Sequence, residues 1–61
     1  MIMETKWEYK LVSVPNSSRE EHREVAEGRL NQQGQEGWEA VGLTRQGTEH
    51  ALVLLKRPFS N

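Results

Sequence analysis

The stretch His50–Arg57 reads HALVLLKR, and it decides the fold. In an extended chain its apolar side chains alternate onto both faces, with Ala51, Val53 and Leu55 on one face and Leu52 and Leu54 on the other. A strand that is apolar on both faces belongs in the middle of a sheet rather than at an edge. We therefore predict a central strand over this stretch, ended by Pro58.

Two further stretches are predicted to be the strands that flank the central one. Lys6–Val14 (KWEYKLVSV) alternates apolar and charged residues, becomes apolar on both faces toward its end, and stops at Pro15. Gly37–Thr44 (GWEAVGLT) predicts another strand, in which Gly42 marks either a bulge or a close backbone approach. Gln46–Glu49 then forms the hairpin loop into the central strand.

The chain between the first two strands predicts a helix that ends at Gln33. A capping box opens it at either Ser17 or Ser18, because a glutamate follows each serine by three residues. Gly34 suits the left-handed position just beyond the last helical residue. The apolar residues of this helix are few, namely Val25, Ala26 and Leu30. We expect it to lie on a sheet with most of its surface in water.

The element order strand, helix, strand, strand predicts an α+β fold, a single β-α-β-β unit. The helix returns the chain across the sheet, so the first two strands run the same way and the third lies antiparallel between them, giving the order 1-3-2. We expect one domain over residues 1–61, with an ordered core of about residues 6–58. One helix can cover only one sheet face. We therefore expect a homo-oligomer, a dimer or larger, whose interface contains Leu52, Leu54 and Val12.

Length and composition also favour a partner subunit. The chain has 61 residues, no cysteine and 34% hydrophobic residues, so neither disulfides nor a large core can brace it.

A net charge of −1 argues against nucleic-acid binding, which normally needs a basic excess. The longest apolar run, Ala51–Leu55, is far below the roughly 20 residues that span a bilayer. The start carries no leader-like pattern, so we expect a cytoplasmic protein with no membrane contact.

Three motifs resemble a known family. They are WEYK at Trp7–Lys10, LNQQGQEGWE at Leu30–Glu39 and LKRP at Leu55–Pro58. They are similar to the small bacterial and phage domain-of-unknown-function family 4177, and the resemblance covers most of the chain, roughly residues 6–58. That resemblance implies a compact strand-helix-strand-strand unit and no established activity. Dodecins, which form flavin-binding shells, share the element order, an analogy of fold alone.

The residues exclude most catalytic chemistry. The chain has no cysteine and no aspartate, and its serines lack the context of an activated nucleophile. His22 and His50 are 28 residues apart and do not form a metal-ligand pattern. Gly34 and Gly37 follow a helix, the wrong order for a phosphate loop. We therefore expect no enzyme activity, no catalytic residue, no metal and no cofactor.

Binding residues are expected among the large aromatics and the strand-end cations. Trp7 and Trp38 can serve as core, as oligomer contacts, or as platforms for a planar ligand. Lys6 begins the first strand and Lys56 and Arg57 end the third. If those strands are antiparallel neighbours, the three cations gather at one end of the sheet. The alternative is that these charges only discourage edge-to-edge aggregation.

Two functions follow from these expectations. The first is a non-enzymatic homo-oligomeric binding protein that holds a small anionic, nucleotide-like ligand between subunits, which in a phage would act as a sponge for a host defence signal. Each subunit is too small for a deep pocket of its own, so the site would be shared. The alternative is a protein-interaction module, an inhibitor or adaptor, that docks through an exposed sheet face or edge.

Overall fold

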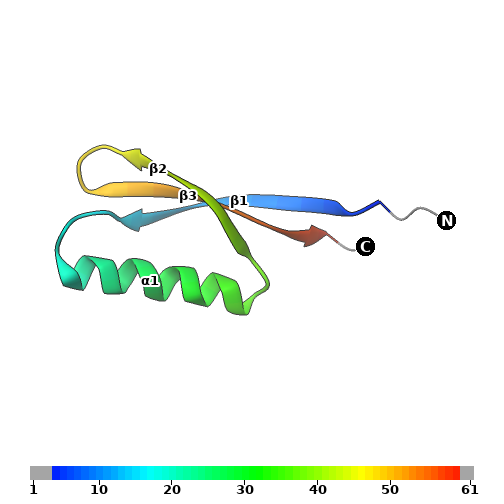
Figure 1. Cartoon of the computed structure of the whole chain (residues 1–61), viewed down its shortest axis with the longest axis horizontal. Helices are drawn as coiled ribbons and strands as arrows, with labels where there is room; N and C mark the ends of the chain where they lie inside the picture. Colours follow the sequence, from blue (N-terminus) through cyan, green and yellow to red (C-terminus); the bar gives the residue numbers. More distant parts are fainter. Residues whose placement is uncertain (1–3, 60–61) are drawn as a thin grey trace.

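A computed structural model describes residues 4–59. Its elements are β1 (Lys6–Pro15), α1 (Glu20–Gln35), β2 (Glu39–Gln46) and β3 (His50–Phe59) (Figure 1). The three strands form one sheet in the order β1-β3-β2, and both pairings are antiparallel. This is the β-α-β-β architecture that the two-faced apolar strand predicted, with that strand in the centre.

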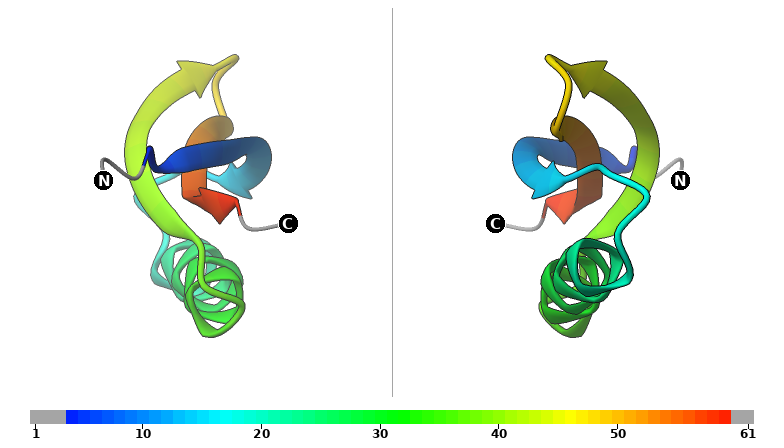
Figure 2. Two further views of the ribbon diagram at one scale, coloured as in Figure 1. Left: turned by 90° about the vertical axis from the view of Figure 1, so that its right-hand side faces the viewer. Right: turned by 90° about the vertical axis from the view of Figure 1, so that its left-hand side faces the viewer.

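The helix covers one face of the sheet. The core on that face consists of Val14, Ala51, Val53 and Leu55, and of the half-buried Val12, Ala26, Leu30 and Trp38 packed against them. No residue of α1 is fully buried, and the end views show the helix lying along one side of the strands (Figure 2). The core is thus small and rests mainly on β3, as expected for a thinly apolar helix.

The helix begins later than the capping-box patterns predicted. Its N-cap residue is Arg19, which makes no capping bond with its side chain, so neither Ser17 nor Ser18 takes that position. Instead, Ser17 Oγ accepts the backbone N–H of Arg19 at 3.2 Å and lies 2.7 Å from Nδ1 of His22. The serine hydroxyl is therefore used in a turn before the helix, a common competing role for serine.

The helix also ends later than predicted, and the left-handed residue is Gly37 rather than Gly34. Gly37 has φ 92°, and its N–H donates to the Gly34 carbonyl at 3.0 Å. The N–H of Trp38 donates to the Gln33 carbonyl at 3.1 Å. These two bonds form the Schellman motif, which ends the helix and fixes the position of Trp38.

Pro58 does not end β3, which continues to Phe59. Pro58 pairs with Trp7, beyond the point where β2 begins with the Glu39–Lys56 pair. The missing N–H of a proline is tolerated where no further strand needs it. In consequence β1 and β3 extend past β2 and α1 as a two-stranded ribbon (Figure 1).

Gly42 marks a bulge in β2, because the register with β3 shifts between Ala40 and Gly42. A Cβ at this glycine would meet nothing within 4 Å, so the second reading, a close backbone approach, is wrong. Bulges bend and twist the strand that carries them. In the end views β2 curves away from the β1–β3 pair (Figure 2).

Candidate binding surface

The sheet face opposite α1, called the open face from here on, has no other element of residues 4–59 over it. Strand alternation and register place five large side chains on it: Trp7, Tyr9, Leu11, Leu52 and Leu54. Leu11 is 64% exposed and Tyr9 60%. A contiguous exposed apolar patch on a small domain marks a binding surface.

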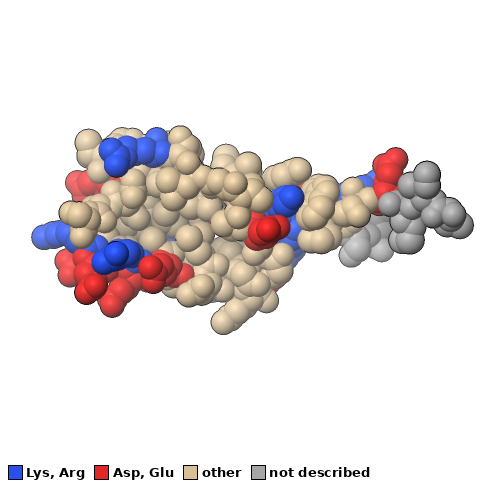
Figure 3. Space-filling model, viewed as in Figure 1, with Lys and Arg blue, Asp and Glu red and all other residues tan. Residues whose placement is uncertain are grey.

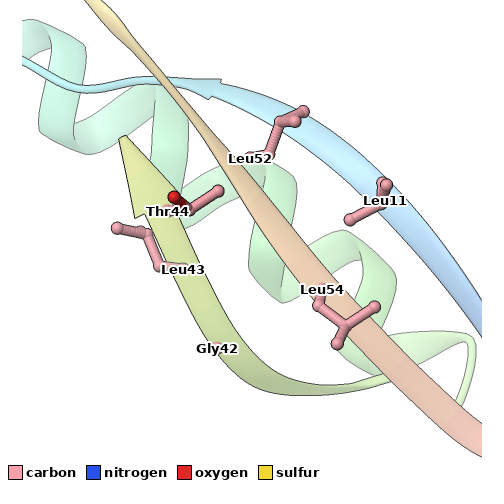
Figure 4. Close-up of a pocket in the computed structure, with 6 residues that line it drawn as sticks. All are labelled: Leu11, Gly42, Leu43, Thr44, Leu52 and Leu54. Atoms are coloured by element: carbon pink, nitrogen blue, oxygen red, sulfur yellow. The ribbon is translucent and has the colours of Figure 1, made fainter. Parts of the chain in front are cut away.

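A shallow hollow of about 330 Å³ lies in the middle of the open face. It is lined by Leu11, Gly42, Leu43, Thr44, Leu52 and Leu54 (Figure 4). The three strands each contribute to it, and α1 lies behind them in this view. The Gly42 bulge supplies a position without a side chain, and Thr44 brings the one side-chain hydroxyl of the lining. The hollow therefore suits an apolar group.

Beside this hollow the open face carries an aromatic side chain paired with a cation. Nζ of Lys56 lies 4.3 Å from the centroid of the Trp7 ring. Tyr9 is the cross-strand partner of Lys56. A cation over an indole ring is an attractive contact, and the ring and ammonium together suit a planar anionic ligand. Tyr9 and Leu11 were missing from the predicted site, although they follow Trp7 at every second position of the strand and therefore share its face.

Trp38 lies on the helix-covered side, in a second cluster. Its ring is contacted by Nζ of Lys10 at 4.8 Å and by the Arg57 guanidinium at 4.3 Å. Nε of Arg57 donates to Oε1 of Glu8, and Nη1 donates to the Glu36 carbonyl at 2.7 Å. These contacts are all within one subunit. They connect the ribbon to the end of the helix, and they leave the Arg57 charge paired.

The three cations at the strand ends do not form one group. Lys56 and Arg57 are successive residues of β3, so they project from opposite faces of the sheet. Lys6 lies opposite Phe59, further along the ribbon. Strand alternation in the sequence was sufficient to predict this separation. On the open face, Lys56 is the member of this trio that accompanies an aromatic ring.

The residues predicted to form an oligomer interface are divided between the two faces. Leu52 and Leu54 lie on the open face, where 37% of Leu54 is exposed. Val12 lies opposite Val53 and packs against the core on the helix side. The open face therefore includes the two leucines without the valine.

Charge is concentrated away from the open face. Glu20 and Glu21 occupy the first turn of α1, and acidic side chains gather over the start of the helix (Figure 3). Ion pairs join Arg19 to Glu21 and Arg23 to Glu20, on highly exposed side chains. Within residues 4–59, no group of three acidic or histidine side chains is arranged to hold a metal ion. No helix in the same range is long and apolar enough to cross a membrane.

No family model, curated protein or solved structure matches this chain. The role of the open face must therefore be argued from its own chemistry.

Proposed function

We propose that this protein is a non-enzymatic binding protein that works as a homo-oligomer, with subunits that associate through the open face. The observation that carries this proposal is the row of exposed apolar side chains on a sheet with no cover. Association would supply burial that the four-residue core does not.

The ligand we propose is a small anionic, nucleotide-like molecule held between subunits. Trp7 and Tyr9 offer rings for stacking, and Lys56 offers the positive charge on the same face. The hollow is open and shallow and has a volume of about 330 Å³, at the lower end of the roughly 300–1,000 Å³ of ligand pockets. A second subunit across it would close the site. Arg57 is already bonded to Glu8 and to the Glu36 carbonyl, and Trp38 packs against the core, so we assign both a structural role.

In a phage such a protein would be a cytoplasmic sponge that sequesters a signal of host defence. The resemblance to family 4177, whose members occur in phages and bacteria, supports that setting. Membership of that family stays a prediction.

Two measurements test the proposal, one for association and one for binding. Sedimentation equilibrium should give at least a dimer, and Leu54→Arg should lower the measured mass. Titration calorimetry against cyclic mononucleotides, cyclic dinucleotides and flavins should detect a ligand whose binding is lost in Lys56→Gln. Arg45→Gln, an exposed cation on β2, is the matched control and should still bind. A wild-type monomer, or no heat with any member of the panel, would count against the proposal.

A second function, a protein-interaction module, is favoured by the same open face and by the uncovered outer edge of β1. An inhibitor or adaptor of this kind would dock on a protein partner through apolar contacts. Capture of one defined partner from native lysate, lost in Trp7→Ala and kept in Arg45→Gln, would favour this function. Trp7 is preferred to Trp38 for this test because Trp38 is committed to contacts within the subunit.

A further inference from the structure

β1 is an edge strand, and within residues 4–59 no strand lies beside the outer side of its backbone. The N–H of Asn16 donates to the Glu49 carbonyl on the β3 side. The carbonyl of Ser13 accepts Nη1 of Arg29, at 2.9 Å, on the other side. Backbone groups of alternate residues face alternate edges in an antiparallel pair. The residues of β1 whose backbone N–H and C=O groups point away from β3 are therefore Trp7, Tyr9, Leu11 and Ser13.

Only the last of these four has its outward carbonyl covered. Arg29 reaches that carbonyl from α1, so the helix protects the Ser13 end of the edge. For the other three residues, the hydrogen bonds among residues 4–59 include none to an outward N–H or carbonyl. Unpaired edges of this kind are templates for another strand. The open length runs from Lys6 to Val12 and contains no proline.

We propose that a second copy of this chain pairs with this edge, antiparallel and two-fold symmetric, with Tyr9 opposite Tyr9 of the second copy. This arrangement places Glu8 opposite Lys10 of the other copy, twice by symmetry. It also places Trp7 opposite Leu11 on the open face. Opposite charges and aromatic–aliphatic pairs across strands are both stabilising.

Electrostatic repulsion disfavours the two registers that are shifted by one residue. With the symmetry axis at Glu8, Glu8 would lie opposite Glu8 of the other copy, and Lys6 opposite Lys10. With the axis at Lys10, that lysine would lie opposite the same lysine of the other copy. Like charges directly opposite one another destabilise a strand pair. Both neighbouring registers are therefore disfavoured.

Strand length and chemistry disfavour the next two registers. An axis at Trp7 would match Lys6 with Glu8, but it would pair only three residues of the strand because β1 begins at Lys6. An axis at Leu11 would place Trp7 opposite Pro15, which has no N–H to donate. The axis at Tyr9 uses seven residues, 6–12, and avoids both problems.

The inference deepens the proposed function and rests on it in one respect, namely that the protein acts as an assembly of its own copies. Edge pairing would join two sheets into one of six strands. The two open faces would then be continuous, with Trp7, Tyr9 and Lys56 of both copies around the seam. The aromatic and cationic part of the proposed ligand site would therefore be present twice along this seam, beside the two hollows.

Single cysteine variants test the pairing, because the chain has no cysteine of its own. Opposing residues of a hydrogen-bonded pair have Cα atoms about 5.5 Å apart. Tyr9→Cys should therefore cross-link to itself with a short thiol reagent such as dibromobimane. Trp7→Cys and Leu11→Cys should each fail alone, because the same residue of the other copy is about 13 Å along the strand. Mixed together, those two variants should cross-link. All three positions are exposed, so each variant should keep the native circular dichroism spectrum.

The outcomes separate this inference from the proposed function. If Tyr9→Cys stays uncross-linked while Leu54→Arg dissociates the wild-type assembly, edge pairing is overturned and association through the open face stands. If Tyr9→Cys cross-links while Leu54→Arg leaves the mass unchanged, the edge is the interface and the open-face association falls. Self-cross-linking of Trp7→Cys or Leu11→Cys would overturn the register.

Discussion

At the residue scale, Gly37 is the position where the backbone most restricts the sequence. Its φ of 92° lies in the region that side chains disfavour. We expect Gly37→Ala to lower the free energy of unfolding by about 1 kcal/mol or more, because alanine must strain the Schellman turn. Gly34→Ala is the matched control, since this helical glycine has open space around a Cβ. That control should raise stability by up to about 1 kcal/mol. Urea unfolding distinguishes the two, and equal effects would contradict the assignment.

Arg57 is the second residue with a large local effect, because its side chain holds the ribbon, the helix end and Trp38 together. The last turn of α1 has no basic residue of its own, so Arg57 donates to its terminal carbonyl from β3. Its side chain is 36% exposed and that of Glu8 34%, so solvent weakens the ion pair only partly. We expect Arg57→Met to cost about 1–3 kcal/mol of stability.

The measurement for Arg57 combines urea unfolding with tryptophan fluorescence, because the loss should also move the Trp38 ring. Arg45→Met is the control: this exposed arginine on β2 should change stability by less than about 0.5 kcal/mol. Equal stability in the two variants would show that the contacts of Arg57 contribute nothing.

At the element scale, patterns within strands predicted more than patterns at element ends. The order of the elements and the central place of β3 followed from apolar side chains at alternating positions. Burial of these side chains supports the same arrangement at several positions of one strand. The ends of α1 did not follow, because several local choices were nearly equal. Ser17 Oγ accepts from the Arg19 N–H and contacts the His22 side chain instead of serving as the N-cap, and Gly37 takes the role that Gly34 could have filled. Each outcome rests on only two local hydrogen bonds, and the sequence does not rank the alternatives.

The strands should differ in how often they open. Every residue of β2 is exposed, whereas β3 alternates buried residues along its length and is paired on both sides. We expect the amides that β2 donates to β3 to exchange with solvent faster than those in the β1–β3 ladder, because few buried contacts protect them. Hydrogen exchange followed residue by residue by NMR measures this. Uniform protection across the sheet would contradict it.

At the scale of the whole molecule, the sequence predicted that one sheet face is uncovered but did not identify all the residues on it. Two apolar faces on β3 and a single helix predicted one uncovered face. Alternation alone puts Tyr9 and Leu11 on one face with Trp7, but only the register, which pairs them with Lys56 and Leu54, shows that this is the uncovered face. The pairing of Arg57 with Glu8 likewise depends on register, since 49 positions separate them in the chain. Long-range pairs of this kind are what the fold adds to the sequence.

Association and folding should be coupled in this protein, because the core formed by residues 4–59 has only four buried residues. A partner that binds only the folded chain stabilises it in proportion to its concentration. We expect the melting temperature to rise as protein concentration increases from the low micromolar to the high micromolar range. Leu54→Arg should melt lower and show a weaker dependence, because a charge on the open face prevents association through that face. Thr44→Arg, which places a cation elsewhere on the hollow, should weaken the dependence in the same direction, whereas Arg45→Met should keep it. Differential scanning calorimetry at matched scan rates measures all four. A wild-type melting temperature that is constant over a hundredfold range of concentration would mean that one subunit is stable alone, and the exposed leucines would then need a different partner.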